Sequence, residues 1–400
     1  MTTRETSRQT EGDLEIKPLG EQSMAETVSI PHESVAVDNE HRLAAKLVLE
    51  DGTEYRGWSF GAKKSRAGEV VFNTGMVGYV ESLTDPSYRG QLLVSTYPLV
   101  GNYGVPKQDH AGPFGLSVTR ESYQIHACGL VVADYSESYS HWNAEQSLGD
   151  WLKSEGIPGI SGIDTRALTQ RLRERGSMLG KIEVDGDEEV EFDDPNTRNL
   201  VEEVSIAERG VFGSGDKNIL LVDTGAKYNI IRSLAQRGAT VTRVPWDADI
   251  ADELDRFDGV MLSNGPGDPT MCGKTVELVR TALSRDIPLF GICLGNQLLS
   301  LAIGANTYKL KYGHRGQNQP VIECGTNNCF VTSQNHGFAV DTESLPEDWR
   351  PWFENLNDRT NEGIRHAWKP FRSVQFHPEA CPGPVDTAYL FDEFLRMLSK

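Results

Sequence analysis

One stretch constrains this chain more than any other: a cysteine that stands between two glycines, directly after a short apolar run. The run Ile287–Ile292 is typical of a buried β-strand, and the residues from 297 to 303 are typical of a helix. Gly291-Ile-Cys293-Leu-Gly295 therefore has the pattern of a nucleophile elbow, with sulfur in place of the usual serine oxygen. The tight turn of such an elbow requires small residues two positions before and two positions after the nucleophile.

This position would make Cys293 reactive. Backbone N–H groups and the helix dipole at the start of a helix lower the pKa of a thiol and can hold an oxyanion. The competing interpretation is that Cys293 is a small buried core residue, which is the commonest fate of a cysteine. The elbow alone leaves both interpretations open.

Composition excludes several classes of function. The chain has 400 residues, which suggests two or three domains, and its formal net charge is −19. A strongly acidic chain without a basic patch is not expected to bind nucleic acid. There is no apolar run long enough to cross a bilayer, and the first residues do not resemble a signal peptide. We therefore expect a cytoplasmic protein that does not enter a membrane.

The cysteine pattern points to free thiols. Six cysteines are present, and no two of them form a C-x-x-C pair. Such spacing signals neither a zinc cluster nor a thioredoxin motif. We expect a reducing compartment and no metal site.

Changes in composition divide the chain into four parts. Residues 1–41 are polar and acidic without apolar periodicity, so we predict a disordered acidic extension. Residues 42–182 alternate short apolar runs with turn signals, which predicts a strand-rich α+β domain with a helix at 165–175. Residues 183–217 begin with a dense acidic run and are interpreted as an acidic linker.

The last part, residues 218–400, alternates strands with helices. This order predicts an α/β domain with a doubly wound parallel sheet covered on both faces. Ligands bind at the carboxyl ends of the strands in such sheets. A glycine-rich loop, Gly265-Pro-Gly267, follows one predicted strand, and Cys293 follows the next. We therefore expect the loop and the thiol to face the same crevice.

A cysteine nucleophile needs a base, and the base needs an orienting partner. The best candidate is His377-Pro-Glu379, because it follows a strand-like segment and an extended backbone points residues two apart to the same side. The competing interpretation of this tripeptide is a surface turn. His336, in Gln334-Asn-His-Gly-Phe338, is a second candidate base, although a structural role suits it better.

Taken together, these motifs resemble those of the class I triad glutamine amidotransferases. The narrower likeness is to the small subunits of carbamoyl-phosphate synthetase. In the second domain it rests on Ser263-Asn-Gly-Pro-Gly-Asp-Pro269, Lys311-Tyr-Gly-His-Arg-Gly-Gln-Asn-Gln-Pro320, Ser333-Gln-Asn-His-Gly-Phe338 and His377-Pro-Glu-Ala-Cys-Pro-Gly-Pro384. In the first domain it rests on Gly68-Glu-Val-Val-Phe-Asn-Thr74, Thr84-Asp-Pro-Ser-Tyr88 and Gly162-Ile-Asp-Thr-Arg166.

The resemblance implies roles for individual residues. Cys293 matches the nucleophile, His377 the general base and Glu379 its partner. The positions that match glutamine-binding residues are Ser87, Gly265, Gly267, Leu294, Gln297, Asn335, Gly337 and Phe338. Ser87 comes from the first domain, so the resemblance places the substrate between the two domains. Asn296 departs from the histidine of many relatives, and we expect it to tune activity without abolishing it.

The resemblance also implies an activity and a partner. Glutamine would be hydrolysed through a cysteine thioester, and the ammonia would pass to a separate large synthetase subunit. ATP and magnesium are expected on that subunit, and no cofactor is expected in this chain. Two alternatives stand beside this hypothesis: a glutaminase subunit of another ammonia-using synthetase, and a non-catalytic regulatory subunit on the same fold. The choice between arginine and pyrimidine synthesis, the allosteric effectors and the oligomeric state are left open.

Overall fold

The computed structural model describes residues 42–107 and 112–398. The predicted extension, residues 1–41, lies outside the described residues. Two sheets organise the rest of the chain, a closed barrel and a ten-stranded sheet.

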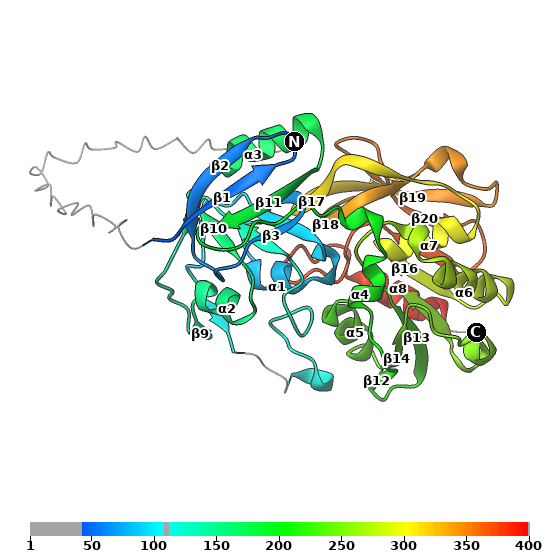
Figure 1. Cartoon of the computed structure of the whole chain (residues 1–400). Helices are drawn as coiled ribbons and strands as arrows, with labels where there is room; N and C mark the ends of the chain where they lie inside the picture. The colour runs from blue at the N-terminus through cyan, green and yellow to red at the C-terminus, as the bar shows by residue number, and fades with distance from the viewer. Residues whose placement is uncertain (1–41, 108–111, 399–400) are drawn as a thin grey trace, which may run out of the picture. The chain divides into compact units, whose positions relative to one another are not determined.

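The first sheet closes into a barrel of seven strands (Figure 1). Their order is β1 (Ala44–Leu49), β11 (Met178–Val184), β3 (Arg66–Asn73), β4 (Gln91–Ser95), β7 (Gly129–Val131), β10 (Gly159–Ser161) and β2 (Glu54–Ser59). Side chains alternate between the two faces of each strand, so Val70 and Phe72 belong to one apolar cluster and Val71 to another. The predicted strand-rich domain is confirmed, and the closure of its sheet is a feature that the sequence pattern did not predict.

Helices and short strands cover the barrel. Helix α3 (Thr165–Arg175) begins and ends where the sequence predicts, because the Asp164 carboxylate accepts a hydrogen bond from the Ala167 N–H and Gly176 ends the helix at φ 110°. The remaining elements of this part are α1 (Tyr79–Thr84), α2 (Leu148–Ser154), β5 (Leu99–Val100), β6 (Val105–Pro106), β8 (Asp134–Tyr135), β9 (Ala144–Gln146) and the 3-10 helices Pro86–Tyr88 and Pro113–Gly115.

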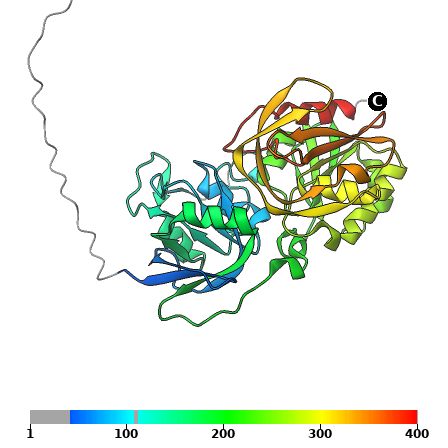
Figure 2. The ribbon, with the colours of Figure 1, turned by 90° about the horizontal axis from the view of Figure 1, so that it is seen from above.

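The segment 183–217 is more ordered than the linker that we predicted. It contains the end of β11, a 3-10 helix at Pro195–Thr197, helix α4 (Leu200–Val204) and strand β12 (Gly210–Phe212). Figure 2 shows this segment in green between the barrel and the second sheet. Its apolar residues explain the order, since Leu200, Val201 and Val204 are buried. Because the segment begins with an acidic run, we predicted a linker and did not identify this small apolar face.

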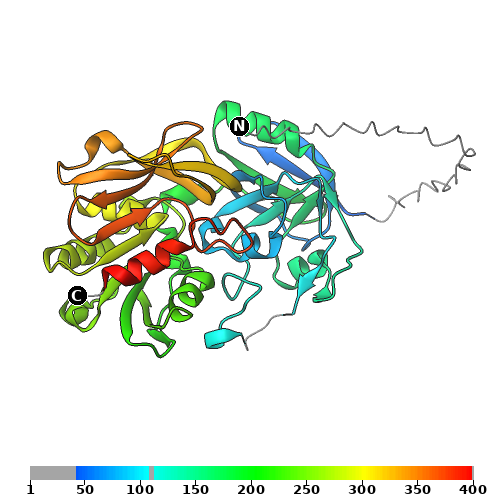
Figure 3. The ribbon, with the colours of Figure 1, turned by 180° about the vertical axis from the view of Figure 1, so that it is seen from behind.

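The second sheet is doubly wound around a parallel core. The parallel strands are β14 (Ala239–Pro245), β13 (Lys217–Asp223), β15 (Gly259–Leu262), β16 (Leu289–Ile292) and β21 (Phe371–Val374). Helices α6 (Gly273–Ser284) and α7 (Leu294–Ala302) share an apolar core with one face. Helices α5 (Tyr228–Ala235) and α8 (Tyr389–Met397) share a core with the other. Figure 3 shows α8 in red, on the face opposite to α6 and α7.

The same sheet continues into an antiparallel half that we did not predict. It is formed by β20 (Asn361–His366), β19 (Trp349–Asn355), β17 (Thr307–Glu323) and β18 (Cys329–Val340). Strand β12 adds an antiparallel edge beside β14. Short 3-10 helices at Ala251–Arg256, Pro269–Met271 and Thr342–Ser344 connect the elements. The predicted parallel sheet is thus the core of a larger mixed sheet.

Candidate active site

The elbow has the strained geometry that its sequence predicts. Strand β16 ends at Ile292, and Cys293 follows with φ 55° and ψ −102°, a conformation that L-residues rarely adopt. A Cβ atom at Gly291 would lie 2.5 Å from the carbonyl oxygen of Gly295, and one at Gly295 would lie 2.5 Å from that of Leu262. Both flanking glycines are therefore required by close backbone contacts.

The predicted base and its partner lie together after the carboxyl end of β21, the strand that pairs with the elbow strand β16. His377 Nδ1 is 2.6 Å from Glu379 Oε1, and both side chains are buried. Because Nδ1–H donates to the carboxylate, Nε2 is the nitrogen left for proton transfer, and it has no hydrogen-bond partner among the described residues. The Cys293 thiol donates to the Asn335 carbonyl oxygen, with 3.6 Å between Sγ and O.

Electrostatics favour a charged base. Burial and the Lys227 ammonium lower the pKa of His377, but Glu379 and the Cys293 thiol outweigh them and raise it to about 10. Burial raises the pKa of Glu379, whereas Lys227 and His377 lower it, and the net result is about 2. The site thus holds an imidazolium against a carboxylate, which orients the ring and stabilises its positive charge.

Sequence reasoning missed two charged residues that support the triad. The Lys227 ammonium lies 3.2 Å from Glu379 Oε1 and 3.5 Å from Asp85 Oδ2. Burial lowers the pKa of Lys227, but neighbouring carboxylates outweigh this effect and hold the pKa above its usual value. These carboxylates are Asp85, Glu379 and Glu121. Lys227 follows the carboxyl end of β13, which is the edge where site residues are expected, and this position was the available signal.

The barrel contributes directly to this site. Asp85 and Ser87 belong to the loop and 3-10 helix after α1, where the Asp85 carboxylate accepts from the Ser87 N–H. The Asn264 amide donates to Ser87 Oγ at 3.0 Å, and the Asn335 amide donates to Asp85 Oδ2 at 3.2 Å. The barrel and the second sheet therefore share one buried hydrogen-bond network.

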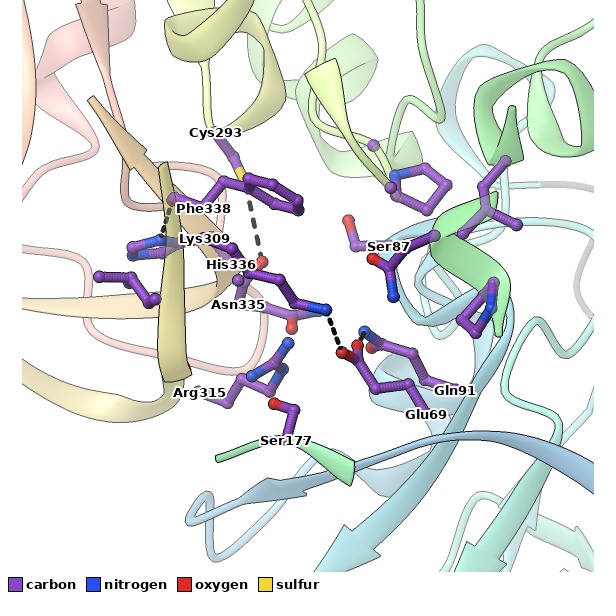
Figure 4. Close-up of a pocket in the computed structure, with 18 of the residues that line it drawn as sticks. Glu69, Ser87, Gln91, Ser177, Cys293, Lys309, Arg315, Asn335, His336 and Phe338 are labelled. Carbon is purple, nitrogen blue, oxygen red and sulfur yellow. Dashed lines mark hydrogen bonds and ion pairs between the residues drawn. The ribbon is translucent and has the colours of Figure 1, made fainter. Parts of the chain in front are cut away.

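One pocket collects most of the residues that the sequence assigned to glutamine (Figure 4). Cys293 lines it together with Ser87, Gly265, Gly267, Gln297, Asn335, Gly337 and Phe338. Leu294 does not line the pocket; it is buried behind Gly265. Residues that we did not predict complete the walls, among them Glu69, Lys309 and Arg315. The Lys309 ammonium pairs with Glu69 at 2.7 Å, and Figure 4 shows this pair across the pocket from Cys293.

The glycine-rich loop lines the same pocket as the thiol, and its backbone has no room for a side chain at Gly265. A Cβ atom at Gly265 would lie 1.9 Å from the Thr224 carbonyl oxygen, and Gly267 has φ 84°. Leu294 is the first residue of α7, so its N–H has no acceptor within the helix. N–H groups from Gly267 and Leu294 are the donors that we predict for an oxyanion.

Two further sequence predictions concern side chains next to the triad. Asn296 is fully buried and is engaged away from the thiol, because its amide donates to Gln375 Oε1 and its carbonyl accepts from Ser373. His336 lines the pocket, but its Nδ1 lies 2.8 Å from the Phe338 carbonyl oxygen. His377, with its carboxylate partner, stays the predicted base.

Within residues 42–107 and 112–398, no helix combines the length and apolar content needed to cross a membrane.

Family models match both parts of the chain. The model described as glutamine amidotransferase class-I matches residues 220–397. The model described as carbamoyl-phosphate synthase small chain, CPSase domain, matches residues 47–182. The fold and the thiol site thus have the features of a class I glutamine amidotransferase joined to a second, family-specific domain.

Similar proteins are both free-standing and fused. The carbamoyl phosphate synthase arginine-specific small chain of Saccharomyces cerevisiae is 50% identical, over 89% of this chain and 89% of its own length. The multifunctional protein CAD of Squalus acanthias is 56% identical over 88% of this chain, which spans only 16% of that relative. A mitochondrial carbamoyl-phosphate synthase [ammonia] of Aquarana catesbeiana is 49% identical over 89% of this chain and 24% of its own length. The chain belongs to the family of carbamoyl-phosphate synthase small chains, as its motifs indicated.

Proposed function

We propose that this chain hydrolyses glutamine and delivers the ammonia to a separate carbamoyl-phosphate synthetase subunit. One observation carries the proposal: a strained cysteine at a strand-to-helix turn shares a buried site with a carboxylate-oriented histidine. Family membership supplies the reaction class, and the pocket beside the thiol is lined by all of the residues expected to bind glutamine except Leu294.

The reaction proceeds in two halves. His377 Nε2 takes the proton of the Cys293 thiol, and the resulting thiolate attacks the side-chain amide carbon of glutamine, while N–H groups of Gly267 and Leu294 stabilise the oxyanion. The His377 imidazolium gives its Nε2 proton to the leaving nitrogen, which departs as ammonia and leaves a thioester on Cys293. Neutral His377 then takes a proton from water, the water oxygen attacks the thioester, and glutamate is released.

The second half of the proposal concerns the partner. Four exposed apolar side chains line one shallow cleft on the barrel domain: Met76, Val77, Tyr97 and Leu99. This cleft lies beside the loop that follows Glu379, because the Gln317 amide donates both to the Val77 carbonyl and to the Pro382 carbonyl. Exposed apolar clusters commonly mark protein interfaces. We place the docking surface of the synthetase here, in a cytoplasmic complex, with ATP and magnesium bound by the partner.

Glutamate release measured with and without the synthetase tests this function. The chain with synthetase, ATP and bicarbonate should release glutamate and form carbamoyl phosphate at matching rates. A chain that hydrolyses glutamine equally well in all conditions would be an independent glutaminase. A chain that never releases glutamate, although it binds the synthetase, would be a non-catalytic subunit. Either result would overturn the proposal.

A further inference from the structure

Three buried side chains converge in the antiparallel half of the second sheet. His314 on β17 and His336 on β18 are directly opposite each other in the strand register, and Glu362 lies on β20. Their relative exposures are 8%, 4% and 0%. One nitrogen from each ring and one carboxylate oxygen all lie within 4.8 Å of one another. None of these residues belongs to the triad.

The hydrogen bonds of His336 fix which nitrogen carries its lone pair. Nδ1 lies 2.8 Å from the Phe338 carbonyl oxygen, and only an N–H can satisfy that contact. In the neutral ring with Nδ1–H, Nε2 carries the lone pair. The lone pair on Nε2 therefore faces Gln334 Oε1 at 3.3 Å and Glu362 Oε1 at 3.9 Å. The orientation of the Gln334 amide is set by its NH2 group, which donates to Thr332 Oγ1.

His314 presents the same arrangement from the other side. Its Nε2 lies 2.7 Å from Asp358 Oδ2, so the Nε2–H donates to that carboxylate. Its Nδ1 lies 3.2 Å from Glu362 Oε1. A histidine whose outer nitrogen donates to a carboxylate or a backbone carbonyl is typical of metal ligation. Both histidines have such an outer partner, and both inner nitrogens face the same carboxylate.

Glu362 is only partly satisfied within the cluster. Burial lowers the pKa of His314, but Asp358 and Glu362 outweigh it and raise this pKa to about 9, so a metal ion has to replace the proton on His314 Nδ1. Glu362 is fully buried, and its Oε2 has no hydrogen-bond partner among the described residues. The Asn355 amide donates to Oε1 at 3.0 Å, which is a neutral contact. Together with Asp358 the cluster carries two carboxylates, and the nearby Arg315 guanidinium donates to the Tyr312 carbonyl oxygen. A buried carboxylate oxygen without a hydrogen-bond partner is costly, and a divalent ion bound by Glu362 and the two inner nitrogens would satisfy it.

We propose that His314 Nδ1, His336 Nε2 and Glu362 bind a zinc ion, with Gln334 Oε1 as the fourth donor. Zinc takes nitrogen and oxygen ligands at about 2.0–2.2 Å in a tetrahedron, which needs neighbouring donors roughly 3.3–3.5 Å apart. Glu362 Oε1 lies 3.2 Å from His314 Nδ1 and 3.9 Å from His336 Nε2, so a small movement brings these donors to the required spacing. Four protein donors that are all buried leave no open position for water, so the site is closed. The ion would tie β17, β18 and β20 together beside the glutamine pocket, which His336 lines.

Metal content of the full-length chain tests the proposal directly. A chelator first removes metal from the purified protein, which is then incubated with zinc and dialysed. The zinc content per chain is measured by elemental mass spectrometry. One zinc ion per chain is expected, and Glu362→Gln and His314→Asn should each reduce zinc affinity at least a hundredfold. Asp358→Asn keeps every ligand and removes only an outer partner, so a loss of about 10–100-fold is expected. His141→Asn, at an exposed histidine, is the matched control and should leave binding unchanged.

Cobalt substitution locates the ion. Bound cobalt should show visible bands of a tetrahedral nitrogen and oxygen site, which Glu362→Gln removes. A thiolate charge-transfer band would place the ion on cysteine and overturn the proposal. So would a wild-type chain that takes up no stoichiometric zinc, or ligand variants that bind as tightly as the control. Circular dichroism shows whether each variant is folded. If a ligand variant does not fold, the zinc affinity of Asp358→Asn tests the proposal in its place. None of these measurements depends on glutaminase activity.

Discussion

At the scale of single residues, Lys227 connects the predicted base and its carboxylate partner to the barrel domain. Its ammonium group can only donate hydrogen bonds. Because the Nδ1–H of His377 already donates to Glu379, Nδ1 has no lone pair with which to accept one, and the 3.1 Å approach of Nζ to Nδ1 is a packing contact. The donors of Lys227 are directed instead to the carboxylates of Glu379 and Asp85. The residue thereby neutralises a site that would otherwise hold buried negative charge.

Replacing this lysine should therefore affect stability and chemistry together. Lys227→Met leaves two buried carboxylates without their cation, which we expect to cost roughly 3–5 kcal/mol in the free energy of unfolding. Glutamate release should fall as well, because Lys227 no longer holds Glu379, the carboxylate that orients the His377 imidazole. Lys153→Met is the matched control, since Lys153 pairs with Asp150 at the surface and should change stability by less than about 1 kcal/mol. Urea unfolding curves of equal midpoint for both variants would contradict this role.

Ser87 tests whether the barrel takes part in substrate binding. Its hydroxyl lines the pocket, and removing one polar contact to glutamine should weaken binding by roughly 0.5–1.5 kcal/mol. Because the triad is untouched, Ser87→Ala should raise KM more than it lowers kcat. Steady-state glutamate release measures both constants. An unchanged KM would show that Ser87 does not contact glutamine. Ser154→Ala, in α2, is the control and should change neither constant.

At the scale of elements, the elbow depends on backbone contact between β15, β16 and α7. Gly295→Ala would place its Cβ 2.5 Å from the Leu262 carbonyl oxygen, so we expect a loss of roughly 1–3 kcal/mol in stability and a loss of activity. Gly273→Ala is the matched control at the start of α6, where a Cβ meets nothing within 4 Å. It should stabilise the chain by about 0.4–1 kcal/mol. Equal melting temperatures would show that the elbow tolerates a side chain.

The elements that the sequence predicted well are those with local signals. The Gly-x-Cys-x-Gly spacing, the Asp164 cap and the alternation of strands and helices each lie within a few residues. Strands β17 and β18 were missed because their register shifts between Lys309 and His314, and again between Gly316 and Gln319, which breaks the alternation of polar and apolar residues. Several of their polar residues line the pocket or form the histidine cluster, so these strands lack the usual alternating pattern.

At the scale of the whole molecule, local sequence patterns could not predict which strands pair when those strands lie far apart in the chain. The barrel closes only because β1 pairs with β11 and β2 with β10, and each pair joins residues about 100 or more positions apart. No local pattern encodes such contacts. Lys227, Asp85 and the histidine cluster were missed for the same reason, because each becomes significant only beside residues from other elements.

The docking surface also belongs to this scale. Val77 is 52% exposed in the apolar cleft, and a charge there would be desolvated when the synthetase binds. Val77→Asp should therefore weaken the complex about tenfold or more, measured by calorimetry or co-sedimentation with the synthetase. Val211, on edge strand β12, is 62% exposed and lies outside the cleft. Val211→Asp should bind normally, and equal weakening by both substitutions would place the interface elsewhere.

The most direct test of the whole account compares two nitrogen sources in one complex. In the proposed function the Cys293 thiol is needed only to release ammonia from glutamine, so Cys293→Ser assembled with the synthetase should make no carbamoyl phosphate from glutamine. The same complex should make it at the normal rate from added ammonium chloride. Carbamoyl phosphate formation from each source is measured beside the wild-type complex. Normal synthesis from glutamine by the variant would contradict the assignment of Cys293 as the nucleophile.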